Sequence, residues 1–228
     1  MIILSISTST NICSVCLGNE NTIIKELSIH DAKTHSENLM PLIDKLLKTT
    51  NYSLKDINYL ACDVGPGSFT GIRIGIATIK AISEVHNIPI VPISSLQALS
   101  YNANISDGLI CSMIDARNEN IYYCIFDKNH LPIQDLKAEH IDDALNCLSK
   151  LNNKITFVGN GAIVNKEKII EKLSSKAIFH EQNDLLSSKV LVTARKKIEK
   201  KEYCNADELL PIYLRKSQAE RMLEKNEK

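Results

Sequence analysis

The chain has 228 residues, enough for one large domain or two moderate ones with a substantial core. Lysine plus arginine and aspartate plus glutamate both number 27, so no basic excess marks the chain as one that binds nucleic acid by itself. It has no apolar span of transmembrane length, and its N-terminus lacks the basic stretch of a signal peptide. We expect a soluble, cytoplasmic protein with no membrane partner.

The seven cysteines favour the same compartment, because most lie inside apolar runs, where reduced cysteine behaves as a small hydrophobe. Cys13 and Cys16 have the spacing of redox and zinc pairs. On a strand, however, side chains three residues apart point to opposite faces, so the two sulfur atoms are not expected to meet. We interpret both cysteines as ordinary strand residues.

The first half of the chain is expected to open with an antiparallel meander and then to alternate helices with strands. The expected elements are strands at 2–6, 12–17 and 22–29, a helix at 36–50, a strand at 59–64, a helix at 71–84, a strand at 88–93 and a helix at 95–101. Thr34 and Glu37 have the spacing of a capping box before the first helix. Pro41 would lie inside that helix, which therefore either bends there or begins at Asn38.

The second half repeats this order, which predicts a duplicated α/β unit. Its expected elements are strands at 109–114, 120–126 and 131–137, a helix at 139–150, a strand at 155–158, a helix to about 174, a strand at 177–180 and a helix at 185–199. The lysine-rich stretch 194–201 is interpreted as a solvated helix face. We expect an N-terminal lobe at 1–103, a C-terminal lobe at 104–205, and an extended segment with a polar tail at 206–228.

The stretch 65–75, Gly-Pro-Gly-Ser-Phe-Thr-Gly-Ile-Arg-Ile-Gly, lies between an expected strand and an expected helix. Backbone N–H groups at such a helix N-terminus can bind a phosphate. The stretch has neither the Walker lysine nor the spacing of the dinucleotide-binding motif. The hairpin after the first strand offers hydroxyl groups and no acid for magnesium. We therefore interpret these residues as a vestigial nucleotide cradle made of Ser7, Thr8, Ser9, Gly65, Gly67, Ser68 and Thr70.

No other motif indicates catalysis. The six histidines show no H-x-x-x-H pattern, so the sequence predicts no helix-borne zinc site. Ser9 and Ser68 lack the G-x-S-x-G turn of a hydrolase. Gly71 and Gly75 lie inside an expected helix, where glycine costs about 1 kcal/mol relative to alanine. Close approach of another backbone along that face would explain both glycines.

Several phrases of the sequence resemble the TsaB (YeaZ) family and occur in the same order: ILSISTST, HSENLMPLI, GPGSFTGIRIG, ISSLQAL, MIDARNENIYY and PIYLR. The match spans nearly the whole chain. The resemblance implies the two-lobed actin/sugar-kinase/Hsp70-like (ASKHA) fold. It also implies a non-catalytic scaffold subunit of tRNA threonylcarbamoyladenosine synthesis, which forms a heterodimer with the catalytic subunit TsaD and recruits the ATPase TsaE.

The same resemblance implies that ATP and a divalent metal are bound by the partner subunits, and that tRNA is contacted indirectly through the complex. Many family members have aspartate where this chain has Ser7, an acid that helps to hold magnesium in this fold. The alternative, an ASKHA-type ATPase or kinase acting alone, is weakened by that difference. Whether the isolated chain forms homodimers stays open.

We expect TsaD to pack against the two N-terminal helices, at 36–50 and 70–84, because both carry more apolar or small surface than one sheet face needs. The expected interface residues are Leu39, Met40, Ile43, Leu46, Gly71, Ile72, Gly75, Thr78 and Ile79. Gly75→Leu should then abolish the heterodimer and leave the fold intact. The alternative is that both faces belong to the chain's own core.

Overall fold

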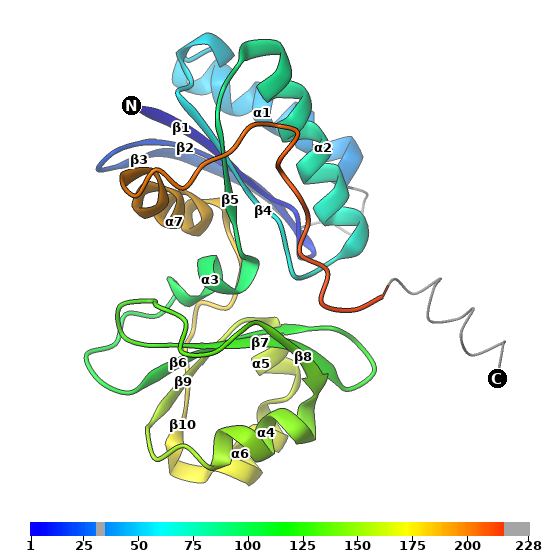
Figure 1. The fold of residues 1–228 in the computed structure, drawn as a ribbon, viewed down its shortest axis with the longest axis vertical. Coiled ribbons are helices and arrows are strands. Elements are labelled where there is room, and N and C mark those ends of the chain that lie inside the picture. Colours follow the sequence, from blue (N-terminus) through cyan, green and yellow to red (C-terminus); the bar gives the residue numbers. More distant parts are fainter. Residues whose placement is uncertain (31–34, 217–228) are drawn as a thin grey trace, which may run out of the picture.

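Two lobes of similar design make up the computed structural model, which describes residues 1–30 and 35–216 (Figure 1). The first lobe contains β1 (Ile2–Ser7), β2 (Ile12–Asn19), β3 (Ile23–His30), α1 (His35–Thr50), β4 (Tyr59–Asp63), α2 (Phe69–His86), β5 (Ile90–Ile93) and α3 (Ser95–Ser100). The remaining elements are β6 (Leu109–Asp115), β7 (Asn120–Phe126), β8 (Lys137–His140), α4 (Ile141–Ser149), β9 (Ile155–Val158), α5 (Asn160–Val164), α6 (Lys166–Leu173), β10 (Ala177–Phe179) and α7 (Ser187–Glu199).

The two sheets have the same topology. The first has the order β3-β2-β1-β4-β5 and the second, taken in the same sense, β8-β7-β6-β9-β10. In each, the central strand pairs antiparallel with the strand that follows it and parallel with the fourth strand of the unit. The predicted duplication of a strand-rich α/β unit is therefore confirmed.

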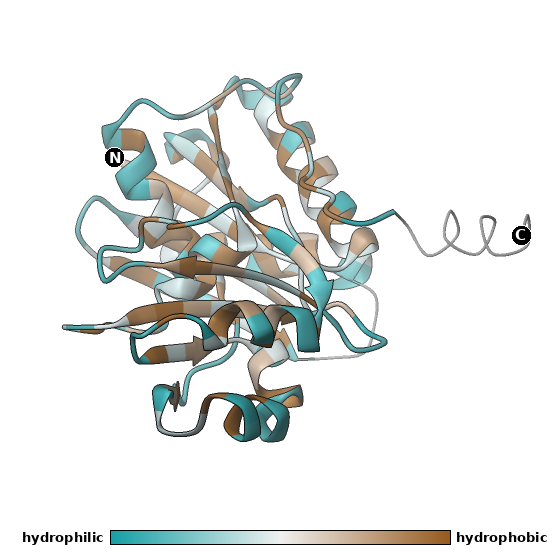
Figure 2. Cartoon of the chain, turned by 60° about the horizontal axis from the view of Figure 1, so that its bottom comes forward, coloured by the Kyte–Doolittle hydropathy of each residue, from teal (hydrophilic) through white to brown (hydrophobic). Residues whose placement is uncertain are grey.

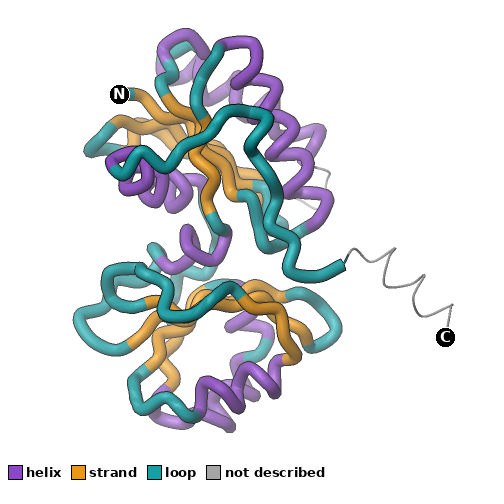
Figure 3. Tube along the Cα trace, viewed as in Figure 1, coloured by secondary structure: helices purple, strands orange, loops and turns teal. Residues whose placement is uncertain are grey.

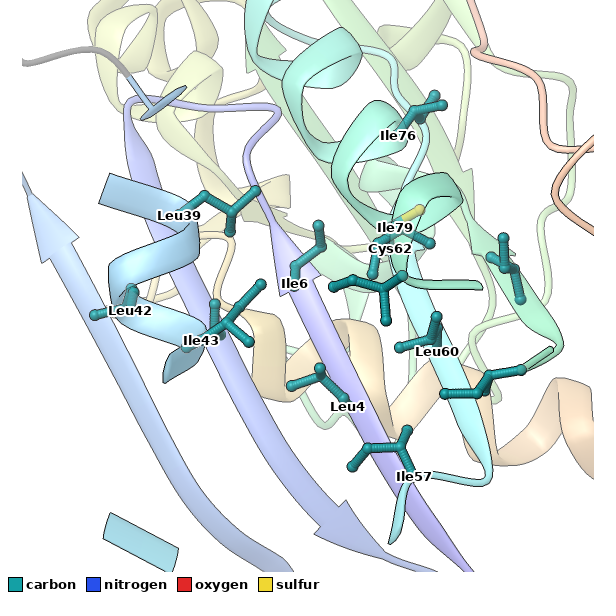
Figure 4. Packing of buried hydrophobic residues seen from close by; sticks show 14 of the residues in the cluster. Leu4, Ile6, Leu39, Leu42, Ile43, Ile57, Leu60, Cys62, Ile76 and Ile79 are labelled. Atoms are coloured by element: carbon teal, nitrogen blue, oxygen red, sulfur yellow. The ribbon is translucent and has the colours of Figure 1, made fainter. Parts of the chain in front are cut away.

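Helices cover the strands in layers, with apolar residues concentrated inside (Figures 2 and 3). Leu4 and Ile6 of β1 face α1 and α2 in one core cluster, which Figure 4 shows in close-up. Ile3 belongs to a second cluster on the opposite face, as period-two alternation requires. Cys13 and Cys16 divide in the same way between the two clusters, so the prediction that they face opposite sides is confirmed.

Helix α7 packs on the first sheet, although it follows the strands of the second lobe in sequence (Figure 1). Val190, Leu191 and Ala194 lie in the cluster that also contains Ile3 and residues of the second sheet. The predicted C-terminal lobe, 104–205, is therefore corrected at this helix. The apolar stripe of a helix in the sequence predicts that one face is buried. It does not predict which sheet that face packs against, because this depends on the path of the chain.

The segment after α7 returns along the first lobe. Cys204 and Ile90 exchange two backbone hydrogen bonds of 2.8 and 2.9 Å, and Leu209 is buried in the cluster beneath α1 and α2. Farther along, the Ile212 N–H donates to the Val64 carbonyl oxygen over 2.7 Å. The predicted polar tail lies outside the described residues from 217 onward.

Three predicted boundaries are wrong for local reasons. The strand expected at 131–137 is displaced: β8 spans Lys137–His140, and the chain before it begins with a turn in which Asp127 accepts from Asn129 N and Leu131 N. The helix expected to continue to 174 is divided into α5 and α6 at Asn165, whose side chain donates to the Gly161 carbonyl oxygen.

The remaining boundary concerns the helix around Pro41. Helix α1 begins at His35 and contains Pro41, so the alternative start at Asn38 is wrong. Pro41 is exposed, where the loss of one backbone hydrogen bond is partly compensated by water. The capping box predicted at Thr34 lies outside the described residues.

Candidate functional site

The predicted cradle lies where the β1–β2 hairpin meets the N-terminus of α2. Ser68 caps α2 by accepting from the Gly71 N–H over 3.2 Å, and its own N–H donates to the Ser9 carbonyl oxygen over 2.7 Å. Ser7, Thr8 and Ser9 are buried, whereas Ser68 and Thr70 are exposed. The structure thus brings the hairpin and the glycine turn together, in direct contact with each other.

Three glycines make this contact possible. A Cβ atom built at Gly67 would overlap the Ser9 carbonyl oxygen, and one at Gly71 would overlap the Thr8 carbonyl oxygen. At Gly75 it would overlap the Thr8 Oγ1 atom. The close backbone approach predicted for the helical glycines is therefore confirmed at Gly71, where the backbone is the chain's own hairpin, whereas Gly75 meets the Thr8 side chain.

The C-terminal segment closes the other side of the turn. Gly65 has a φ of +107°, a conformation that favours glycine, and a Cβ there would lie 2.6 Å from the Ile212 carbonyl oxygen. The Tyr213 ring stacks on Phe69 with 4.5 Å between centroids, and Arg73 Nε donates to Tyr213 Oη over 2.9 Å. Chain segments therefore occupy both sides of the glycine turn.

Asp63 is the acid that the sequence analysis missed. This fully buried carboxylate ends β4 and accepts from Ser7 Oγ over 2.8 Å, from Thr8 N over 3.2 Å and from Ser9 N over 3.3 Å, with a further short hydrogen bond from Ser9 Oγ. Burial raises the pKa of Asp63, and the four hydrogen bonds oppose that rise. Both carboxylate oxygens are thereby directed to the chain's own donors.

A signal for Asp63 was available in the expected topology. If the first strand pairs in parallel with the strand at 59–64, their carboxyl ends meet at one edge of the sheet. The observed register aligns Ile6 with Cys62, which places Asp63 beside Ser7. The hairpin itself offers hydroxyl groups and no acid, as predicted, but β4 supplies an acid beside it.

A small pocket lies between the hairpin and the second lobe. Its volume is about 10 Å³, and its walls include Thr10, Ile114, Asn160 and Asp184. This volume is close to the minimum of roughly 10–15 Å³ that one water molecule requires. This pocket is therefore too small for a nucleotide.

The predicted partner interface is corrected for seven of its nine residues. These seven are buried within the chain: Leu39, Ile43, Leu46, Gly71, Ile72, Gly75 and Ile79. Met40 is 49% exposed and Thr78 is half-buried. Gly75→Leu is also unsuitable as an interface test, because its side chain would collide with Thr8 inside the fold. The apolar stripes of α1 and α2 therefore belong to the chain's own core, which was the alternative to a partner interface.

The described residues contain neither a metal-binding group nor a membrane-spanning helix. Among residues 1–30 and 35–216, no group of three or more histidine, cysteine, aspartate and glutamate side chains is placed to hold a metal ion. No helix in the same ranges is long and apolar enough to cross a membrane.

Comparison with known proteins gives a consistent result. The family model described as "TsaD: tRNA N6-adenosine threonylcarbamoyltransferase" matches residues 22–223. The tRNA threonylcarbamoyladenosine biosynthesis protein TsaB of Bacillus subtilis is 31% identical over 225 residues, which cover 96% of both chains. A tRNA N6-adenosine threonylcarbamoyltransferase of Persephonella marina is 26% identical over 99 residues, only 29% of its length.

Solved structures show the same fold. YeaZ from Pseudomonas aeruginosa superimposes with a TM-score of 0.78 at 21% identity, covering 93% of this chain and 99% of that one. The activator of the 2-hydroxyisocaproyl-CoA dehydratase from Clostridium difficile, with bound ADPNP, has a TM-score of 0.53 at 10% identity over 93% of this chain and 99% of its own. Together with the duplicated sheets, these likenesses confirm the two-lobed ASKHA fold class.

Proposed function

The chain belongs to the TsaB (YeaZ) family of tRNA threonylcarbamoyladenosine biosynthesis proteins, and we propose that it is the non-catalytic dimerisation subunit of that pathway. In this role it binds and activates the catalytic subunit TsaD and helps to recruit TsaE. TsaD would then hold the divalent metal and the reacting groups, and tRNA would be contacted through the complex, in the cytoplasm.

The observation that carries the non-catalytic role is the filled cradle. Phosphoryl transfer needs a carboxylate that is free to hold magnesium and backbone N–H groups that are free to hold phosphate. Here Asp63 is fully buried and accepts four hydrogen bonds from the hairpin. The Gly71 N–H already donates to Ser68 Oγ, and the pocket beside the hairpin has a volume of about 10 Å³.

The isolated chain is therefore expected not to bind ATP. Titration of the chain with ATP and magnesium in a calorimeter should give no saturable heat, because a nucleotide would have to expel the hairpin from the glycine turn. The same titration of a mixture with TsaD is the positive control. Saturable binding with turnover by the isolated chain would instead support the alternative, an ATPase or kinase acting alone, with Asp63 as its metal ligand.

We place the TsaD contact on the outward faces of α1 and α2, which lie side by side on one face of the first sheet (Figure 1). Met40 of α1 is 49% exposed and Val85 of α2 is 78% exposed. Ala81 and Ala77, one and two turns before Val85 on α2, are exposed small residues. Exposed apolar and small residues on two adjacent helices suit helix-on-helix docking.

Met40→Asp is expected to weaken TsaD binding by about 30-fold, because truncation or charging of a central apolar contact costs roughly 2 kcal/mol or more. Size-exclusion chromatography and calorimetry with TsaD measure the loss. Ile163→Asp on α5 is the matched control, since Ile163 is 48% exposed in the other lobe. Equal affinity of the two variants would contradict the assigned face. If the isolated wild type elutes as a dimer and Met40→Asp as a monomer, a second copy uses the same face.

A further inference from the structure

A second concave site shares no lining residue with the pocket beside the hairpin. It is a pocket of about 170 Å³ formed by α3, by the end of α7 and by the turn that follows β7. Figure 1 shows α3 and α7 next to each other at the junction of the lobes. We call it the lysine pocket and define it by Tyr101, His130, Lys196, Lys197 and Lys200.

The pocket is lined by three lysines and one carboxylate, that of Glu202. Lys197 lies 3.7 Å from a Glu202 carboxylate oxygen and donates to the Pro92 carbonyl oxygen over 3.1 Å. Within the described ranges, neither Lys196 nor Lys200 forms an ion pair with a carboxylate. The pocket therefore carries an excess of positive charge, although the whole chain is neutral.

Aromatic contacts position one of these ammonium groups. The Lys196 Nζ atom lies 4.9 Å from the centroid of the Tyr101 ring, a cation–π geometry. His130 stacks on the same ring with 3.9 Å between centroids, and its Nδ1 atom lies 3.3 Å from Ser100 Oγ. Burial lowers the pKa of His130, and the charges of Lys196 and Lys189 lower it further. The Asp127 carboxylate opposes this by raising the pKa of His130, and burial is the main cause of the shift.

We propose that the lysine pocket binds a phosphate group of a small phosphorylated ligand. Ammonium groups are strong donors to phosphate oxygens, and the amide side chains of Gln97 and Asn129 line the same pocket. The volume is below the roughly 300–1,000 Å³ of sites for drug-sized ligands, so a phosphate group fits better than a large molecule. The negative end of the α7 dipole explains why lysines are favoured there, but not why they border a pocket.

This site is independent of the proposed role in binding TsaD, because it shares no residue with the outward faces of α1 and α2. The same phosphate chemistry could also come from an RNA backbone. The full chain is therefore titrated separately with inorganic phosphate, with ATP and with a short single-stranded RNA, by calorimetry at low ionic strength. Binding should weaken as salt is added, since it depends on charge.

Lys196→Gln and Lys200→Gln are each expected to weaken phosphate binding by about tenfold, and the double variant should abolish it. Lys172→Gln on α6 is the matched control, because it removes the same charge from an exposed helix position. Lys196→Arg keeps the charge and should retain binding, and thermal melting confirms that each variant is folded. The Lys196→Gln and Lys200→Gln variants should still bind TsaD like the wild type.

Three results would overturn the proposal. One is the absence of saturable binding for all three probes. Another is equal weakening in Lys172→Gln, which would show a non-specific charge effect. The last is ATP binding that survives both lysine substitutions, which would place the nucleotide in the cradle. Binding of RNA alone, lost in the Lys196 and Lys200 variants, would identify a backbone phosphate as the source.

Discussion

Replacing Asp63 with alanine is expected to lower the free energy of unfolding by about 3–5 kcal/mol, one of the largest effects of any substitution in this chain. The carboxylate is fully buried and accepts from Ser7 Oγ, from Ser9 Oγ and from two backbone N–H groups. Without it, these donors remain buried and lose their acceptor. Since the chain has no tryptophan, urea denaturation followed by circular dichroism is the suitable measurement.

The control is Asp107→Ala, which removes an exposed carboxylate and should change stability by less than about 0.5 kcal/mol. The loss of stability in Asp63→Asn should lie between those of Asp63→Ala and Asp107→Ala. The asparagine amide retains one acceptor oxygen, but its NH2 group would face the donors of the hairpin. If Asp63→Ala is as stable as the control, the carboxylate does not hold the hairpin against β4, and the closed cradle loses its main support.

Gly71→Ala is expected to destabilise the chain by about 2 kcal/mol or more, although alanine is the better helix former by roughly 1 kcal/mol. The added methyl group would overlap the Thr8 carbonyl oxygen, which is backbone and cannot rotate away. Relief would require separation of α2 from the hairpin, with loss of the 2.9 Å hydrogen bond from Thr8 Oγ1 to the Gly71 carbonyl oxygen. The measurement is again urea denaturation.

Ala77→Gly, at an exposed position of the same helix, supplies the baseline, with an expected loss of about 1 kcal/mol from helix propensity alone. Gly71→Ala adds a methyl group to α2 and Ala77→Gly removes one. Helix propensity alone would therefore make the first substitution stabilising and the second destabilising. Both should be destabilising here. A gain in stability from Gly71→Ala would show that the hairpin does not pack tightly on α2.

Local patterns in the sequence were sufficient for the elements and their order. Alternation of apolar residues predicted that Cys13 and Cys16 face opposite sides of a strand, and the glycines at 65–75 predicted the turn between β4 and α2. These features depend on neighbours within a few residues, so they survive without knowledge of the tertiary structure. The same holds for the duplicated order of strands and helices. The ASKHA fold itself was implied by the resemblance to the TsaB family.

The tertiary structure decided what each face and each polar group meets. The stripe of α1 that includes Leu39 and Ile43 predicted a buried face, and only the packed chain shows that its own sheet covers them. Asp63 and Ser7 are 56 residues apart, and the parallel register of β1 and β4 joins them. Gly71 and Gly75 indicated a close backbone contact in the sequence. The fold places the Thr8 carbonyl oxygen at Gly71 and the Thr8 side chain at Gly75. A local pattern shows that space is needed, but not which distant segment fills it.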